Sequence, residues 1–343
     1  MKVARLGSVT SPKNVLTYLG WGRSLLSPRE RLLPGLGARL GAHPRLASAI
    51  LVGLRRLPTA RLRASVYRHV SRPLVRRMNA RLEVPVSGGS RMIVDTSDVI
   101  GRSLAVSGTW ETHVTPVLAR LLTPGDVCVD VGAHVGYFTL LASKLVGAEG
   151  SVYAIEPAPA TYAALQENLE LNSVTNVIAL NVAAGAEDGR ATLYDPFPGN
   201  TGEATMRYVP ALWTAREQAL ASGVEVPVRR VASVVPDAQV TQVRLVKIDV
   251  EGYELEVLRG LESWFRAGGG PALIVELHPA LWAEGDERRF ADLCRRYSLE
   301  PIALVDEDRL DCATADPIGR ASAGGRQDLL LVPKRSIVSP LRR

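Results

Sequence analysis

Residues 127–138 read VCVDVGAHVGYF, and this stretch decides the fold. The apolar run 127–131 predicts a buried strand, and 135–146 predicts the helix that follows it. Gly132 and Gly136 therefore fall in the turn between strand and helix, where glycine lets a ligand approach the backbone and the helix N-terminus offers free N–H groups. In a doubly wound sheet, cofactors bind at such a turn. The stretch predicts an α/β fold with a cofactor site at the end of this strand.

The pattern continues outward from this stretch as alternating strands and helices. We expect strands at 151–155, 177–180, 244–248, 272–276, 301–305 and 328–332, and helices at 114–122, 160–171, 252–265 and 287–297. Short, almost wholly apolar strands separated by helices predict a mostly parallel, Rossmann-like sheet with helices on both faces. A hairpin is expected at 82–86 and 91–95. The Pro- and Gly-rich residues 195–227, between strands at 191–194 and 226–231, predict an insertion that acts as a lid or specificity loop.

The spacing of glycines and acids indicates which cofactor the turn binds. A dinucleotide site expects G-x-G-x-x-G, whereas this turn reads G-x-x-x-G, so a pyrophosphate fits less well. Asp130 ends the first strand and suits an amine-bearing ligand, and Glu156 ends the second strand, where a carboxylate accepts hydrogen bonds from ribose hydroxyls. A nucleoside with an amino-acid tail, such as S-adenosylmethionine, has this shape. An NAD-dependent Rossmann oxidoreductase is the first alternative. His134 lies inside the turn and is expected to shape the cofactor site.

Two further clusters follow later strands and are candidates for the acceptor side. Residues 247–254 read KIDVEGYE, which places Asp249 and Glu251 at the end of a buried strand, facing the same crevice as Gly132. Residues 276–279 read ELHP, and His278 is a candidate general base for a hydroxyl. Glu276 would either contact the ligand or orient His278. Asp249 and Glu251 could ligate a divalent metal, but the sequence gives no complete ligand set, so no metal site is predicted.

Charge is distributed unevenly along the 343 residues. Residues 1–80 contain 16 Lys and Arg and a single acid, Glu30, whereas the remainder holds 25 basic and 34 acidic residues. A basic segment can contact nucleic acid, an anionic membrane or an acidic partner, or it can pack on the acidic remainder, which is the commonest outcome. We divide the chain into a basic, partly helical extension (1–81), a catalytic domain (82–335) and a short tail (336–343). A helix is expected at 59–81, interrupted by Pro73, with only short helical stretches before it.

Cysteine usage and hydropathy indicate a cytoplasmic location. Cys128, Cys294 and Cys312 are widely separated and give neither a disulfide framework nor zinc spacing. Lys2 and Arg5 are not followed by a continuous apolar stretch, which argues against a secretory signal. The apolar run near 47–54 is too short to cross a membrane.

Several of these motifs together resemble the FkbM family of methyltransferases. The resemblance rests on residues 130–138 (DVGAHVGYF), 156–157 (EP), Asn168 with Asn172, 247–254 (KIDVEGYE), 257–260 (VLRG) and 276–279 (ELHP), and extends over about 82–333. It implies a class I methyltransferase fold, S-adenosylmethionine as donor, and O-methylation of a natural-product or saccharide hydroxyl. It further implies a cofactor site lined by Glu111, Asp130, Gly132, Ala133, His134, Gly136, Glu156 and residues 181–183, including Val182 and Ala183. Asp249, Glu251 and His278 would face the acceptor.

The chain departs from the family pattern at two places. His134 stands where asparagine is frequent, and Ala232-Ser233 stands where Leu-Asp is common. A second alternative to a methyltransferase is a non-catalytic, methyltransferase-like binding module that uses its basic arm to recruit nucleic acid or lipid. The intact Asp130, Gly132, Glu156 and Asp249 argue against it.

Overall fold

The computed structural model describes residues 36–57, 59, 65–66, 70–195, 199–207, 222–265, 270–305, 309–311 and 326–333. The expectations for residues 1–35, for Cys312 and for the tail 336–343 lie outside these residues. So does the middle of the predicted insertion, residues 208–221.

The central sheet of the described residues has eight strands in the order β12-β11-β13-β10-β9-β3-β4-β5. The strands are β3 (Val127–Val131), β4 (Ser151–Ile155), β5 (Val177–Leu180), β9 (Val243–Ile248), β10 (Ala272–Leu277), β11 (Leu299–Val305), β12 (Arg309–Asp311) and β13 (Gln327–Pro333). β10, β9, β3, β4 and β5 are parallel neighbours, while β13 is antiparallel to both β10 and β11. The predicted mostly parallel, doubly wound sheet is confirmed.

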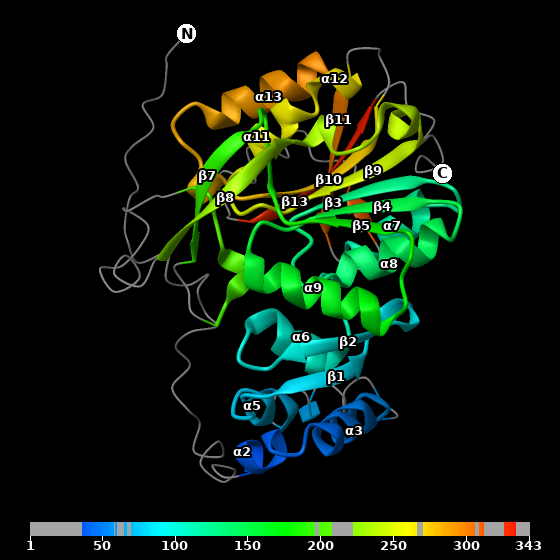
Figure 1. Ribbon diagram of the computed structural model, residues 1–343, viewed down its shortest axis with the longest axis vertical. Helices are drawn as coiled ribbons and strands as arrows, with labels where there is room; N and C mark the ends of the chain where they lie inside the picture. The colour runs from blue at the N-terminus through cyan, green and yellow to red at the C-terminus, as the bar shows by residue number, and fades with distance from the viewer. Residues whose placement is uncertain are drawn as a thin grey trace.

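Helices cover both faces of this sheet (Figure 1). α7 (Thr115–Leu121), α8 (Tyr137–Val146) and α9 (Pro159–Leu171) lie on one side, and α11 (Glu254–Gly260), α12 (Glu262–Phe265) and α13 (Asp286–Arg296) lie on the other. Side chains alternate across each strand. On β3, Cys128 therefore packs into the core beneath α8, whereas Val129 and Val131 pack into the core beneath α11. Two apolar cores hold the strand ends at fixed positions.

The helix expected at 252–265 is divided in two. α11 ends at Gly260, a residue that packs closely on a second sheet: a Cβ on Gly260 would lie 2.1 Å from the carbonyl oxygen of Gly185. That second sheet contains β6 (Ala183–Gly185), β7 (Gly189–Asp195) and β8 (Ser222–Arg230) in the order β6-β8-β7. β7 and β8 are antiparallel, which confirms the strands expected on either side of the insertion.

The segment before the catalytic strands is more ordered than the sequence indicates. It contains α2 (Leu36–Gly41), α3 (Pro44–Arg55), α5 (Arg72–Val75), the antiparallel pair β1 (Arg81–Pro85) and β2 (Arg91–Asp95), and α6 (Val99–Ser107). The expected hairpin is confirmed. The expectation of only short helical stretches before residue 59 is wrong, since α3 has 12 residues. The expected helix 59–81 is also wrong in extent: its described α-helical part is α5 and two residues at 65–66, because the chain turns into β1 at Arg81.

α3 packs on the rest of the molecule through both apolar and polar contacts. Leu51 is 1% exposed, and the guanidinium of Arg55 donates hydrogen bonds to the carbonyl oxygens of Pro85, Leu104, Ala105 and Val106. Among the described residues, no helix combines the length and apolarity needed to cross a membrane.

Asn168 of α9 and Asn172, which directly follows the helix, fix the hairpin to the catalytic core. Asn168 Oδ1 accepts from the N–H of Ile93 at 2.7 Å, and Asn172 Oδ1 accepts from the N–H of Arg91 at 3.0 Å. Their amide Nδ2 atoms donate back to the carbonyl oxygens of the same two residues. The two asparagines that contribute to the family resemblance therefore connect β2 to α9.

Candidate functional site

The turn after β3 approaches the end of β9 so closely that a glycine is required. Gly132 has a φ of +82°, and a Cβ there would lie 1.8 Å from the carbonyl oxygen of Asp249. The N–H of Asp249 donates to the carbonyl oxygen of Val131 at 3.0 Å. β3 and β9 are the neighbours from which the sheet is built outward in opposite directions, which is where ligands bind in doubly wound folds.

Asp130 is the buried acid at the end of β3. It is 2% exposed, and its Oδ2 accepts a 2.6 Å hydrogen bond from the hydroxyl of Thr139, whereas its Oδ1 has no hydrogen-bond partner. Burial raises the pKa of Asp130, and the nearby charge of Lys247 opposes this shift. A buried carboxylate oxygen without a partner is uncommon, and it fits a site completed by a ligand that donates a hydrogen bond.

Glu156 directly follows β4, the strand adjacent to β3. Its two oxygens accept 2.9 Å hydrogen bonds from the backbone N–H groups of His134 and Ala158, so the side chain shapes the glycine turn. Burial raises the pKa of Glu156 to about 7, with those two hydrogen bonds opposing the shift. Each carboxylate oxygen keeps a second lone pair, which can accept from a ribose hydroxyl.

His134 connects the glycine turn to the start of the insertion. Its φ is +50°, and its Nε2 lies 2.8 Å from the hydroxyl of Thr201. Thr201 in turn donates from its N–H and its hydroxyl to Asp98 Oδ1, and Asp98 caps α6 through its other oxygen. Burial lowers the pKa of His134, so the ring is neutral near pH 7. His134 therefore joins the glycine turn to Thr201 as a neutral side chain.

The remaining residues expected around the cofactor lie in several different environments. Gly136 adopts φ +94° and begins α8, and Ala133 donates its N–H to the carbonyl oxygen of Ile155. Ala183 is 1% exposed within β6, and Val182 packs against the core beneath α11. These residues support the turn mainly through their backbone and packing.

Three carboxylates gather around Lys247 at the ends of β9 and β10. Oxygens of Glu111, Asp249 and Glu276 all lie within 4.8 Å of one another, and Lys247 Nζ lies 3.0 Å from Asp249 Oδ2. Burial alone would lower the pKa of Lys247, but the carboxylates of Asp249, Glu111 and Asp130 outweigh burial and raise it. Lys247 therefore stays charged. Burial raises the pKa of Glu111 well above its ordinary value, and one of its oxygens has no hydrogen-bond partner.

Burial and the adjacent Glu276 raise the pKa of Asp249 to about 7, with Lys247 opposing the shift. The pKa of Glu276 is low despite burial, because His278, Arg326 and Asp249 stabilise its charged form. Asp249 is therefore the carboxyl of this pair that exchanges a proton near neutral pH.

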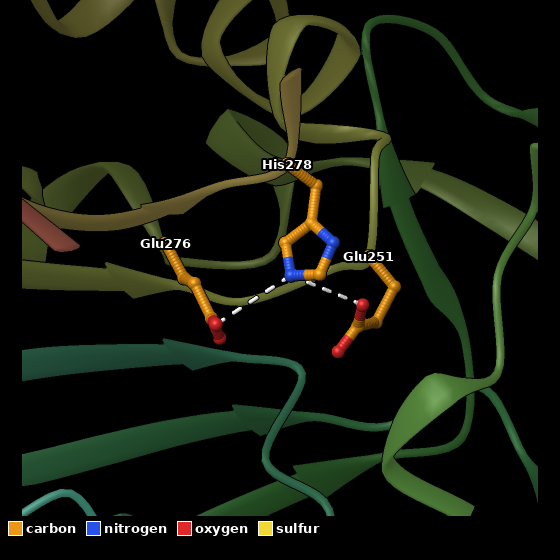
Figure 2. A group of neighbouring side chains, drawn as sticks. All are labelled: Glu251, Glu276 and His278. Atoms are coloured by element: carbon orange, nitrogen blue, oxygen red, sulfur yellow. Dashed lines mark ion pairs between the residues drawn. The ribbon is translucent and has the colours of Figure 1, made fainter. Parts of the chain in front are cut away.

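A second group, shown in Figure 2, contains Glu251, Glu276 and His278. His278 Nε2 points between the two carboxylates, 3.2 Å from Glu251 Oε2 and 3.5 Å from Glu276 Oε1. Burial raises the pKa of Glu251 well above its ordinary value, although Arg326 opposes this shift. The sequence-predicted acceptor residues thus come together, with Glu276 shared between both groups.

Arg326 is the main site residue that the sequence did not reveal. Its guanidinium lies 2.8 Å from both oxygens of Glu251, 2.9 Å from Glu203 and 3.6 Å from Glu276. Glu203 belongs to the insertion. A second residue of the insertion, Thr205, donates a 2.6 Å hydrogen bond from its hydroxyl to the carbonyl oxygen of Glu251. The described residues of the insertion therefore contact the acceptor-side group.

A cavity of about 670 Å³ lies away from these groups, between α11 and α13. Its charged residues neutralise one another, as in the pairs of Asp286 with Arg207 and with Arg289. The lining contains none of the candidate residues.

Comparison with known proteins identifies a protein family and several relatives to which the chain is similar. Residues 130–297 match the model of the methyltransferase FkbM domain. "31-O-demethyl-FK506 methyltransferase FkbM" of Streptomyces tacrolimicus is 31% identical over 187 residues, covering 48% of this chain and 70% of that protein. "Hexuronic acid methyltransferase AglP" of Haloferax volcanii is 29% identical over 197 residues, covering 56% and 72%.

"Methyltransferase 1" of Beauveria bassiana is 33% identical over 145 residues, covering 39% of this chain and 58% of that protein. The chain thus spans about three fifths of that relative's length.

Proposed function

Because the chain belongs to the FkbM family of methyltransferases, we propose that it transfers a methyl group from S-adenosylmethionine to a hydroxyl of a natural product or a saccharide. S-adenosylmethionine, when bound, supplies an electrophilic methyl carbon. The protein's residues would bind the donor, orient the acceptor and accept the hydroxyl proton.

One observation supports the donor site most strongly: the buried, unpartnered Oδ1 of Asp130 lies near the end of β3, adjacent to β4, which Glu156 directly follows. An amine or hydroxyl of the donor would satisfy Asp130, and Glu156 would accept from the ribose hydroxyls. Gly132, Ala133, His134 and Gly136 would form the turn that holds the donor. Glu111 would approach its positively charged end, and the segment containing Val182 and Ala183 would lie near the adenine.

The acceptor would lie against Asp249, Glu251 and His278. Methyl transfer from a sulfonium requires mainly that donor and acceptor be aligned, so positioning carries most of the catalytic effect. The hydroxyl also loses a proton, which a base whose pKa is near the working pH accepts best. Asp249, with its pKa raised to about 7, and His278, whose Nε2 makes no hydrogen bond, are the two candidates for that base.

The decisive experiment is calorimetric titration of the full chain with S-adenosylmethionine, S-adenosylhomocysteine and NAD at pH 8. We expect the first two to bind and NAD not to bind. Glu156→Gln keeps the size of the side chain but removes its charge, and charge-assisted hydrogen bonds contribute about 1.5–3 kcal/mol. Affinity should therefore fall by about tenfold or more.

Glu170→Gln on the exposed face of α9 is the matched control and should bind as the unaltered protein does. Binding of NAD alone would favour the oxidoreductase alternative. Binding of none of the three would favour a non-catalytic module, whose basic residues 1–81 would then be tested for salt-sensitive binding to nucleic acid and to anionic vesicles.

A further inference from the structure

His278 and two carboxylates form a group with the geometry of metal ligation. Figure 2 shows the imidazole between Glu276 and Glu251, with Nε2 directed at the space between their oxygens. One atom from each residue lies within 4.8 Å of the other two. The His278 side chain is 8% exposed, and its Nε2 has no hydrogen-bond partner.

The separations between these atoms fit ligands that share one ion. Two atoms each about 2.1 Å from a metal ion are about 3.0 Å apart in octahedral and about 3.4 Å apart in tetrahedral coordination. Nε2 of His278 is 3.2 Å from Glu251 Oε2 and 3.5 Å from Glu276 Oε1. These distances lie close to that range, although neither contact is aligned as a hydrogen bond.

The carboxylates of the group keep lone pairs for an ion beside Arg326. The guanidinium of Arg326 contacts the carboxylates of Glu203, Glu251 and Glu276. A carboxylate has about four lone-pair positions, so Glu251 can bond to Arg326 and still ligate an ion.

The neighbouring group of Glu111, Asp249 and Glu276 is a weaker candidate for the ion. It contains no imidazole and offers carboxylate oxygens alone. A nitrogen ligand combined with carboxylates favours a divalent transition metal over Mg²⁺ or Ca²⁺.

We propose that Glu251, Glu276 and His278 bind a divalent transition-metal ion at the carboxyl ends of β9 and β10. Binding of the ion is independent of the methyltransferase assignment. Its role rests on the proposed function: the ion would bind the acceptor hydroxyl oxygen and facilitate its deprotonation. His278 would then be a ligand of the ion.

The test is titration of Mn²⁺ into the full chain after dialysis against EDTA. Electron paramagnetic resonance follows the loss of the free Mn²⁺ signal. We expect one ion per chain, and at least a tenfold loss of affinity in His278→Gln and in Glu276→Gln. His43→Gln, at an exposed histidine beside α3, is the matched control and should leave Mn²⁺ affinity unchanged.

Circular dichroism and S-adenosylmethionine titration of each variant verify that it remains folded, which keeps this result separate from the donor assignment. Absence of Mn²⁺ binding by the unaltered chain would overturn the proposal. So would equal affinity in the unaltered chain and in both ligand variants.

Discussion

Replacement of Gly132 by alanine tests the contact between the ends of β3 and β9. An alanine at φ +82° pays the left-handed backbone penalty of about 1–2 kcal/mol. Its Cβ would also lie 1.8 Å from the carbonyl oxygen of Asp249, whereas real Cβ contacts are essentially never below 3.0 Å. The turn or the end of β9 must therefore move by more than 1 Å, and both belong to the proposed binding site.

Gly125→Ala is the matched control for the backbone penalty. Gly125 has φ +90° in the turn before β3, and a Cβ there meets no atom within 4 Å. It should lose only about 1–2 kcal/mol of unfolding free energy. Gly132→Ala should lose about 1–3 kcal/mol more, which is the typical cost of forcing extra atoms into a packed region.

Urea denaturation measures the free energies of unfolding, and calorimetry measures S-adenosylmethionine binding. We expect Gly132→Ala to lose measurable binding and Gly125→Ala to retain it. Equal destabilisation of the two variants, with equal affinity for the donor, would show that the close approach of β3 and β9 does not shape the site.

Three further predictions follow from individual residues. Because burial raises the pKa of Glu156 to about 7, affinity for S-adenosylmethionine should fall about tenfold per pH unit below 7. A carboxyl whose pKa is raised on folding stabilises the fold at low pH, and this contribution is lost as pH rises through 7. Calorimetry and urea denaturation across pH 5–8 should find both dependences reduced in Glu156→Gln, and Asp249, whose pKa is also raised to about 7, accounts for the remainder. Asn168→Ala removes a fully buried amide that bonds to Ile93 and should cost about 2–3 kcal/mol in urea denaturation; a loss below 0.5 kcal/mol would contradict the structural role. Leu51→Ala should lower the free energy of unfolding by about 2–5 kcal/mol if α3 is part of the folded core. Leu46 is 53% exposed on the same helix, so Leu46→Ala should change the melting temperature very little.

The central strands and the glycine turn could be predicted because their signals are local. β3, β4 and β5 are short apolar runs bounded by turn residues, and their predicted bounds match the structure. Asp130, Glu156 and Asp249 were placed correctly at strand ends because parallel strands bring their carboxyl ends to one edge of the sheet.

The features that were missed depend on tertiary contacts between distant residues. Nothing in the sequence near Gly260 indicates that its backbone packs directly against Gly185 of another sheet. Arg326 lies outside every motif, and its importance appears only when Glu203 and Glu251 are brought beside it. α3 was missed because the basic composition around it conceals the buried positions Ala47 and Leu51.

The hydrogen bonds between the two asparagines and β2 determine how the outer edge of the two-stranded sheet is covered. Four residues along a helix advance about 6.0 Å, and two residues along a strand advance about 6.8 Å. Asn168 and Asn172 therefore present their amides in step with Ile93 and Arg91. Each amide accepts from the N–H and donates to the C=O of its partner, as a peptide group of an adjacent strand would.

The helix thus imitates a third strand along the free edge of β2. Unpaired strand edges recruit strands from other molecules and lead to aggregation. These two side chains occupy the main-chain groups through which a second copy of the chain would attach, so they protect the hairpin from intermolecular strand addition.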